Sequence, residues 1–263
     1  MENPNRIVVT TGHKMKPAHI EEATEIAARL RAPYAPRGNT SLDALRAAYG
    51  VPAVMVVKEK LAVATEDGEL YFHPGMAHLR LKNLRRGEGD HLAEAVGLAE
   101  GMRVLDCTLG MGADAIVESF VVGASGEVVA LEANPVVAFL IERGLQTFTG
   151  EHPLTEAAMR RIKVVASDHL DYLRTQPDDS FDAVYFDPMF RHPFEESSGI
   201  HPLRRLADPR PLSPEAVAEA CRVARRRVVL KESSRSLEFD RLGFRETVGG
   251  RYSHIRYGVI RRP

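Results

Sequence analysis

The most chemically informative stretch of this sequence is Asp187-Pro188-Met189-Phe190, which follows an apolar run over residues 181–186. That run predicts a buried strand, so the tetrapeptide stands at a strand end. A carboxylate and a Pro carbonyl there can accept both N–H groups of a planar amine, while the Phe ring stacks on its base. Methyl transfer to an exocyclic amine of a nucleobase needs this arrangement. Asp and Pro are also ordinary turn residues, so the stretch alone is equally compatible with a strand stop.

A second motif, over residues 104–115, favours the chemical interpretation. An apolar strand ends at Asp106, and Gly110 and Gly112 follow before a predicted helix. Glycines let the backbone approach a ligand, and N–H groups at the helix start face it. The spacing also fits a dinucleotide site, but a carboxylate at Asp106 would repel a pyrophosphate and attract an ammonium. S-adenosylmethionine carries an ammonium and no phosphate, so it is the predicted cofactor.

Two further predicted strands end in acidic residues. Glu132 ends the strand over 127–131, where a carboxylate can accept hydrogen bonds from ribose hydroxyls. Ser167-Asp168 ends the strand over 162–166, where a side chain could cap an adenine amino group. Each acid alone is more often a helix cap or a solvated turn residue. Four successive strands that end in acids nevertheless predict a ligand site at the carboxyl ends of a sheet.

Composition bounds the class of protein. The 263 residues are 44% hydrophobic and 27% charged, which is typical of a globular protein with a sizeable core. Residues 201–263 hold 15 Lys and Arg against 7 Asp and Glu, which fits either a polyanion partner or a solvated basic face. Cys107 and Cys221 match no disulfide or zinc spacing. Without a signal peptide or a membrane-length apolar run, the chain is expected to be cytoplasmic.

Periodicity predicts two domains. Residues 1–88 form a small α/β domain that ends in a connector, over 73–89, dense in cations and glycines. Residues 89–263 alternate strand and helix patterns, with strands near 103, 128, 162, 182 and 227. The strands that flank Gly249-Gly250 predict a closing hairpin. The expected fold class is therefore α/β, a Rossmann-like sheet that is parallel with a C-terminal antiparallel hairpin, preceded by the small α/β domain.

One segment of the small domain, Thr10-Thr11-Gly12-His13-Lys14, could be a ligand loop. It lacks the spacing of a phosphate loop, and a turn from strand to helix is the preferred interpretation.

The chain resembles the bacterial small-subunit rRNA methyltransferase J family, which methylates N2 of a guanine. The resemblance rests on the 104–115 motif, Glu132-Ala-Asn-Pro135, Asp187-Pro-Met-Phe190, Val228-Val-Leu-Lys231 and Met76-Ala-His78. It covers residues 75–260 and implies the seven-stranded class I methyltransferase fold. The family pattern has Arg at the positions of Ala113 and Ala133, so backbone contacts could persist there while side-chain contacts could not. The implied cofactor-binding residues are Ala113, Asp114, Glu132, Ala133, Ser167, Asp168 and Asp187.

The residues then take the following expected roles in N-methyl transfer to RNA, with ribosomal RNA or a small-subunit particle as partner. Asp187 and the Pro188 carbonyl accept hydrogen bonds from the target amine, and Phe190 stacks on its base. Lys231 binds a phosphate or the cofactor carboxylate, although a capping or solvated lysine is equally compatible. The cations expected to follow the RNA backbone are Arg80, Lys82, Arg85 and Arg86.

Three rival functions stay open on the sequence alone. The same motif could serve methylation of a protein amide or of a small-molecule amine. The chain could also be a binding module that holds a nucleoside or RNA without catalysis. A nicotinamide oxidoreductase is the third possibility, because the glycine spacing of the 104–115 motif is shared with dinucleotide sites.

Overall fold

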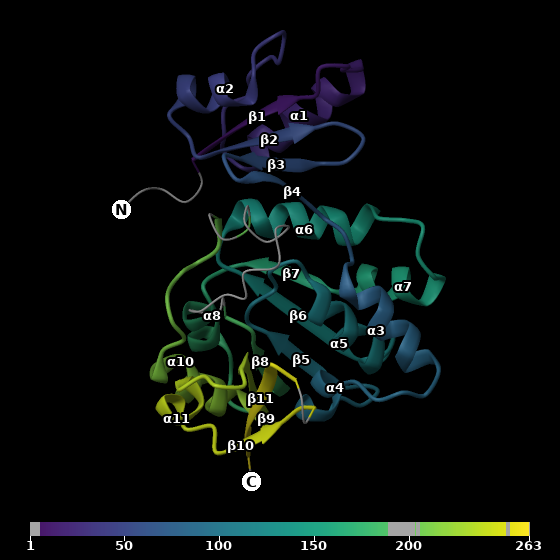
Figure 1. Ribbon diagram of the computed structural model, residues 1–263, viewed down its shortest axis with the longest axis vertical. Coiled ribbons are helices and arrows are strands. Elements are labelled where there is room, and N and C mark those ends of the chain that lie inside the picture. Colours follow the sequence, from purple (N-terminus) through teal and green to yellow (C-terminus); the bar gives the residue numbers. More distant parts are fainter. Residues whose placement is uncertain (1–5, 189–202, 204–205, 251–252, 263) are drawn as a thin grey trace.

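The computed structural model describes residues 6–188, 203, 206–250 and 253–262. Its elements build a four-stranded sheet followed by a seven-stranded sheet. Figure 1 shows the smaller sheet above helix α6 (Pro135–Thr147), with the larger sheet on the other side of that helix. A small α/β unit therefore precedes a larger α/β unit, as the sequence predicts.

The smaller sheet has the strand order β1-β2-β3-β4, in which β1 and β2 are parallel and the other neighbours are antiparallel. Every residue of the first three strands is buried, so both of their faces are covered. Its elements are β1 (Ile7–Thr11), α1 (Pro17–Arg29), α2 (Leu42–Tyr49), β2 (Ala53–Val57), β3 (Ala62–Thr65) and β4 (Gly68–Tyr71).

The chain passes from the smaller to the larger unit through a tight aromatic contact. Phe72, just after β4, packs against Gly144 of α6, where the Cβ of any other residue would stand 2.1 Å from Phe72 Cγ. The Phe72 ring also meets the Phe148 ring edge-on at 5.7 Å. Any larger residue at 144 would push Phe72 away, so Gly144 allows β4 to lie against α6.

The connector predicted over residues 73–89 is partly wrong. The structure places a helix, α3 (Met76–Arg85), inside it, and α3 packs against α5 (Ala113–Val122) of the larger unit. Its apolar residues Ala77 and Leu81 are buried, while most of its cations face outward, which obscures the helical pattern. The domain boundary at residue 88 stays a prediction.

The larger sheet has the strand order β10-β11-β9-β8-β5-β6-β7. The five strands from β9 to β7 are mutually parallel, and β11 and β10 are antiparallel to their neighbours. The class I methyltransferase plan is thereby confirmed. The strands are β5 (Arg103–Asp106), β6 (Glu127–Glu132), β7 (Lys163–Ala166), β8 (Phe181–Phe186), β9 (Ala224–Ser233), β10 (Glu246–Val248) and β11 (Ile255–Arg261).

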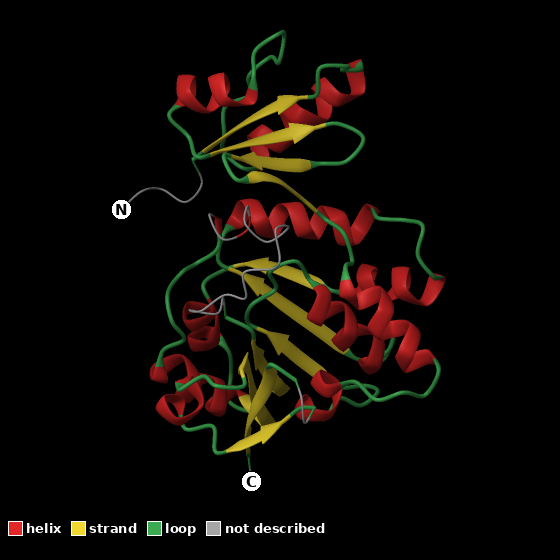
Figure 2. Ribbon diagram, viewed as in Figure 1, coloured by secondary structure: helices red, strands yellow, loops and turns green. Residues whose placement is uncertain are grey.

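Helices cover both faces of this sheet (Figure 2), because the side chains of its strands alternate between two apolar cores. Val104 belongs to the core under α3 to α7, whereas its neighbour Leu105 belongs to the core under α8, α10 and α11. The helices not yet named are α4 (His91–Val96), α7 (Pro153–Arg161), α8 (His169–Thr175), α10 (Pro214–Val223) and α11 (Glu238–Leu242).

Candidate active site at the carboxyl edge of the larger sheet

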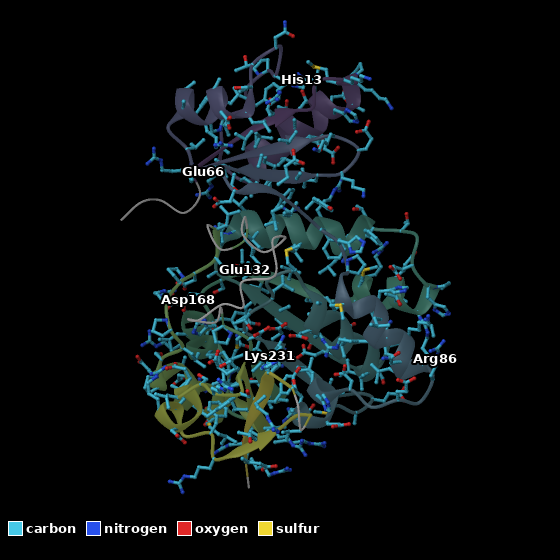
Figure 3. The ribbon with its side chains drawn as sticks, in the orientation of Figure 1. His13, Glu66, Arg86, Glu132, Asp168 and Lys231 are labelled. Atoms are coloured by element: carbon cyan, nitrogen blue, oxygen red, sulfur yellow. The ribbon has the colours of Figure 1, made fainter. Side chains whose placement is uncertain are left out.

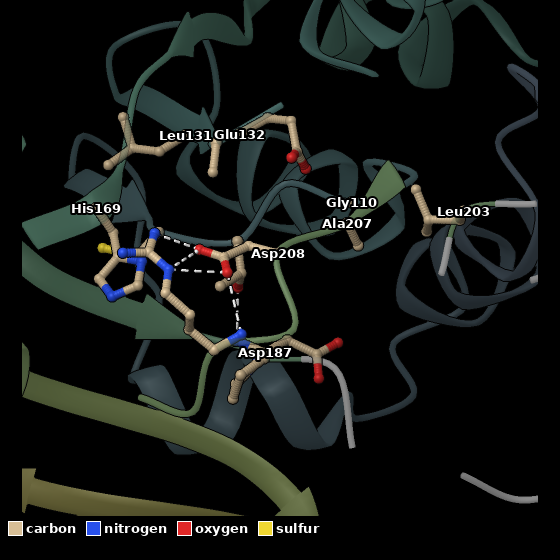
Figure 4. Close-up of a pocket in the computed structure, with 13 residues that line it drawn as sticks. Gly110, Leu131, Glu132, His169, Asp187, Leu203, Ala207 and Asp208 are labelled. Carbon is tan, nitrogen blue, oxygen red and sulfur yellow. Dashed lines mark hydrogen bonds and ion pairs between the residues drawn. The ribbon is translucent and has the colours of Figure 1, made fainter. Parts of the chain in front are cut away.

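A pocket opens where β5, β6 and β8 end (Figure 4). The chain leaves β5 toward β6 on one side and returns to β8 on the other, so this edge is the topological switch point where α/β sheets bind ligands. The pocket holds about 580 Å³ of empty space, including its open mouth. Its lining residues are Cys107, Thr108, Gly110, Leu131, Glu132, Ala133, His169, Asp187, Pro188, Leu203, Ala207, Asp208 and Arg210.

Asp106 ends β5 directly behind this pocket and is 1% exposed. Its Oδ1 accepts the Thr108 backbone N–H at 2.9 Å. Its Oδ2 is buried and has no hydrogen-bond partner among the residues that the structure describes. Burial, helped by the charges of Asp114 and Asp187, raises the pKa of Asp106 to about 8. A buried carboxylate oxygen without a donor is suited to a cationic ligand group.

The loop after Asp106 depends on two glycines in left-handed backbone conformations. Gly110 has φ 50° and lines the pocket, and Gly112 has φ 81° and caps the start of α5. Other residues adopt such φ values only with strain. Ala113 and Asp114 form the first turn of α5 and do not line the pocket. The glycines thus turn the backbone toward the pocket, as the sequence predicts for a ligand loop.

Glu132 ends β6 on the side of the pocket opposite Asp187 (Figure 4). Its side chain is 8% exposed, and Oε1 accepts the Asn134 backbone N–H at 2.9 Å. Burial raises the pKa of Glu132 to about 7, although hydrogen bonds from backbone N–H groups oppose this shift. Ala133 follows in the pocket wall. The Glu132 carboxylate can therefore accept further hydrogen bonds from a ligand.

Ser167 and Asp168 lie beside the pocket and do not line it. Asp168 is the N-cap of α8, where its Oδ1 accepts the Leu170 N–H at 2.8 Å, and it forms an ion pair with Arg210. Burial opposes its ionisation, but these donors together lower the pKa of Asp168. The helix-cap alternative therefore describes the Asp168 side chain in this structure, and its contact with an adenine stays a prediction.

Asp187 follows β8 and reaches the pocket with a 26% exposed side chain. Its backbone N–H donates to Thr108 Oγ1 at 2.6 Å, and its Oδ2 accepts from Lys231 Nζ at 2.7 Å. Burial raises the pKa of Asp187 to about 6, although the Lys231 charge opposes this shift. Pro188 lines the pocket next to it, and Phe190 lies outside the described residues. Lys231 of β9 therefore holds the Asp187 carboxylate, while Thr108 of the glycine loop holds its backbone.

A buried network stands behind Asp187 and centres on Asp114. The Asp114 carboxylate accepts from Lys231 Nζ at 2.8 Å and from the Tyr185 hydroxyl at 2.8 Å, and it pairs with Arg80. Burial alone would raise the pKa of Asp114, but the Lys231 and Arg80 charges hold it well below its usual range. Arg80 also pairs with Asp90 at 2.7 Å. The network thus joins α3, α5, β8 and β9 behind the motif.

This network changes the interpretation of two predicted substrate contacts. The sequence predicts that Lys231 binds a phosphate or the cofactor carboxylate, and that Arg80 follows an RNA backbone. The structure instead commits each of them to two carboxylates of the protein, with side chains 16% and 21% exposed. Asp114, expected at the cofactor, pairs with both. Lys231 contacts Asp187 directly, whereas Arg80 is linked to it only through Asp114 and Lys231.

The exposed cations of α3 lie elsewhere. Arg85 and Arg86 are exposed, and Lys82 also belongs to this helix. Figure 3 places Arg86 on a flank of the molecule, well away from Glu132 and Lys231. The predicted contact of these cations with an RNA backbone stays a prediction. They remain available for a partner that extends along α3.

Sequence reasoning missed several lining residues. Thr108 lies within the glycine motif, and its spacing two residues after Asp106 was the available signal. Asp208 and Arg210 lie in the long connection between β8 and α10, and their residue types alone do not mark them as lining residues.

A buried acid of α5 was also missed. Glu118, four residues after Asp114, is fully buried, and neither of its carboxyl oxygens has a partner among the described residues. Burial, helped by the charges of Asp106 and Asp114, raises the pKa of Glu118 well above its usual range.

Two kinds of feature are absent from the described part of the chain. No group of three or more His, Cys, Asp or Glu side chains there is arranged to hold a metal ion. None of its helices is both long enough and apolar enough to cross a membrane.

Comparisons with known proteins agree with this geometry. A protein family described as "Putative SAM-dependent methyltransferase" matches residues 53–242. YpiP of Bacillus subtilis is 39% identical over 255 residues, which cover 96% of this chain and 98% of that protein. Ribosomal RNA small subunit methyltransferase J of Coxiella burnetii is 30% identical over 226 residues, covering 82% and 83% of the two chains.

A solved structure shares the fold. The crystal structure of the SAM-dependent methyltransferase NGO1261 from Neisseria gonorrhoeae superposes with a TM-score of 0.62, over 97% of this chain and 95% of that one, at 17% identity. The glycine loop, the Asp106 and Glu132 carboxylates and the extended sequence matches all lead to one conclusion. The chain belongs to the S-adenosylmethionine-dependent methyltransferase family, and S-adenosylmethionine is its cofactor.

Proposed function

We propose that this methyltransferase modifies the exocyclic N2 amine of a guanine in ribosomal RNA. The observation that carries the proposal is the fixed Asp187 carboxylate at the pocket wall, followed by the Pro188 carbonyl. Two acceptors at neighbouring positions suit the two N–H groups of a planar amine. The name of methyltransferase J, which this chain matches over 82% of its length, supports ribosomal RNA as the substrate.

The cofactor fits the two acids that end β5 and β6, Asp106 behind the pocket and Glu132 in its wall. The free Oδ2 of Asp106 would accept from the ammonium group, and Glu132 would accept from the ribose hydroxyls. S-adenosylmethionine supplies a sulfonium-activated methyl group. The protein therefore needs no strong nucleophile of its own, and its task is to place the amine in line with that methyl group.

Asp187 would act on the amine as an acceptor. Positive charge develops on the amine nitrogen during methyl transfer, so a carboxylate within hydrogen-bond reach stabilises the transition state more than the ground state. Lys231 and Thr108 hold Asp187 in place before the amine arrives. A pKa of about 6 lets Asp187 stay ionised at neutral pH and also receive the departing proton. Phe190 would stack on the base.

Binding of the product S-adenosylhomocysteine should strengthen as the pH rises from about 6 to about 7.5. Because the pKa of Asp106 is about 8, its carboxyl holds a proton in the unliganded protein. An ammonium ligand needs the carboxylate, so binding releases this proton and the affinity rises by up to about tenfold per pH unit. Asp106→Asn should lower the slope by about one proton, whereas the exposed Asp171→Asn should not. Isothermal titration at three pH values measures both slopes, and equal slopes would rule out this linkage.

The same shift predicts how the stability of the unliganded protein depends on pH. A carboxyl whose pKa is higher in the folded state than in the unfolded chain stabilises the fold while it is protonated. That contribution is complete below the unfolded pKa, near 4, and is lost as the pH rises through about 8. The free energy of unfolding of the wild type should therefore fall over this range, and less steeply in Asp106→Asn. Urea denaturation at each pH checks this.

RNA affinity should depend on the exposed cations of α3. Arg86 caps the C-terminal end of this helix, about 9 Å along the axis from Arg80, which pairs with Asp114 behind the site. An RNA strand bound at the pocket could therefore extend along α3. Replacing both Arg85 and Arg86 by Ala should flatten the salt dependence of binding by about one unit of slope per lost phosphate contact. The matched control is a double variant outside α3, in which both Arg174 and Arg241 are replaced by Ala. An unchanged salt slope in the α3 variant would mean that Arg85 and Arg86 face solvent and do not contact the RNA.

A competition among acceptors tests the substrate class. Purified enzyme and isotopically labelled S-adenosylmethionine would be incubated with the RNA, protein and small-molecule fractions of cells that lack the enzyme. We expect label in small-subunit ribosomal RNA, recovered as N2-methylguanosine by mass spectrometry of the nucleosides. Label confined to the protein or small-molecule fraction would overturn the proposal and leave the methyltransferase assignment intact.

A further inference from the structure

The smaller sheet has its own topological switch point, around β1. Residues 33–35 lie beside β1 as an additional parallel segment, because the Val9 N–H donates to Pro33 O at 2.9 Å and the Ala35 N–H donates to Val9 O at 2.8 Å. β2 lies on the other side of β1 and is also parallel to it. From β1 the chain thus passes through α1 to residues 33–35 on one side of the strand. It then continues through α2 to β2 on the other side. In such sheets a crevice forms outside the carboxyl ends of the parallel strands.

The two helices lie on opposite faces of the small sheet, as this topology requires. Ile26 of α1 belongs to the core with Val9 and Met55, whereas Leu45 of α2 belongs to a separate core with Val8 and Val54. The loops that follow the three parallel segments, residues 12–16, 36–40 and 58–61, therefore meet at one edge. A Cβ at Gly12 would stand 3.3 Å from Lys58 Cβ, so two of these loops are in close contact.

Arg37, in the middle loop, is the unusual residue of this edge. Its side chain is nearly fully buried, at 6% exposure, yet Nε and Nη1 have no hydrogen-bond partner among the described residues. Its Nη2 lies 3.1 Å from His13 Nε2 of the neighbouring loop. A buried guanidinium with unpaired N–H groups is costly, because the charge has lost water without gaining an acceptor. The arrangement calls for an anion.

The net charge of the three loops at this edge also favours an anion. The three loops together contain five Lys or Arg residues and a single acid, Glu59. Among these cations Lys58 pairs with Glu69 at 2.9 Å, outside the loops. The N–H groups of one guanidinium form a planar fork, which matches two oxygens of an oxyanion better than it matches a water molecule. A tetrahedral phosphate also offers a further oxygen to His13.

We propose that the carboxyl edge of the smaller sheet binds a phosphate group, held by the free N–H groups of Arg37 with His13 beside it. The Thr10–Lys14 segment is then a ligand loop, the alternative that its sequence left open. Figure 3 shows His13 at the far end of the molecule from Glu132 and Lys231. A phosphate at this edge is therefore a docking contact that takes no part in methyl transfer, and it does not depend on the proposed substrate.

Inorganic phosphate and the full-length protein provide the test. Thermal shift and isothermal titration in phosphate would be compared with chloride at equal ionic strength. We expect phosphate binding in the wild type and at least about tenfold weaker binding in Arg37→Met. The matched control is Arg31→Met, which removes the same charge at an exposed position six residues before Arg37. This variant should bind phosphate as the wild type does.

The outcomes separate a site from a structural arginine. If the wild type binds phosphate no better than chloride, or if Arg37→Met binds it equally well, the proposal is wrong. Should Arg37→Met fail to fold, His13→Ala serves in its place, because His13 is exposed and its loss keeps the buried arginine. Phosphate binding should then weaken a few-fold, and unchanged binding in His13→Ala would remove the loop from the site.

A second arm identifies the source of the phosphate group. RNA affinity would be measured for the wild type, Arg37→Met and Arg31→Met over a range of salt concentrations. A backbone phosphate of RNA predicts a loss of affinity in Arg37→Met alone, with a salt slope lower by about one. A free phosphate ester predicts unchanged RNA affinity, together with competition by a nucleoside monophosphate in the titration. Both results are consistent with the site, and they assign it to different ligands.

Discussion

Asp187→Ala should fold, bind S-adenosylhomocysteine and lose methyl transfer by a factor of about 10²–10⁴. The carboxylate stands at the pocket wall and acts on charge that forms only in the transition state, so the loss should appear in turnover more than in substrate affinity. Single-turnover methylation of ribosomal RNA measures the rate directly. Phe190→Ala should differ, because a lost stacking contact weakens capture of the base by about 1–3 kcal/mol.

A matched control stands at the other end of the same strand. Asp182 accepts the Arg103 backbone N–H at 2.8 Å and does not line the pocket. Asp182→Ala should lose some stability and keep the single-turnover rate. If folded Asp187→Ala transfers the methyl group at nearly the wild-type rate, then Asp187 is only a strand stop, as its turn-forming residue type allows.

Lys231→Met should destabilise the protein by about 3–5 kcal/mol, the cost of leaving a buried charge without its partner. Lys231 neutralises both Asp114 and Asp187 at 2.8 and 2.7 Å, and all three side chains are at most about a quarter exposed. Without the cation the two carboxylates repel each other across a site of low polarity. Urea denaturation gives the change in the free energy of unfolding, and methyl transfer should fall in parallel because Asp187 loses its anchor.

Lys163→Met is the control for that substitution. Lys163 pairs with Glu127 at the opposite end of the sheet, and its side chain is 67% exposed. Its loss should change the free energy of unfolding by about 0.5 kcal/mol or less. Equal effects of the two substitutions would show that Lys231 is an ordinary surface lysine and that the network does not hold Asp187.

The fold was largely predictable because strand ends carry local signals. The apolar runs before Asp106, Glu132 and Asp187 identified three neighbouring parallel strands, and the glycines after Asp106 identified the ligand loop. Parallel strands bring their carboxyl ends together whatever lies between them in sequence. The pocket therefore followed from pattern alone.

The charge network was not predictable, because it is made by tertiary contacts. Arg80 and Lys231 are far apart in sequence, yet both reach Asp114. Exposed and buried cations have the same sequence signature until a partner is known, so both were expected to face a phosphate. Arg37 was missed for the converse reason. It lies between Pro36 and Gly38 in an ordinary loop, and only the tertiary structure shows that its Nε and Nη1 are buried without a hydrogen-bond partner among the described residues.

Methylation of a guanine in ribosomal RNA at the Asp187 site is most directly tested in cells. Nucleosides of small-subunit ribosomal RNA would be measured by mass spectrometry in a strain that lacks the gene, complemented with wild type or with Asp187→Ala. We predict that one N2-methylguanosine disappears on deletion, returns with the wild-type gene and stays absent with Asp187→Ala. An unchanged content of methylated guanosine in all three strains would contradict this function.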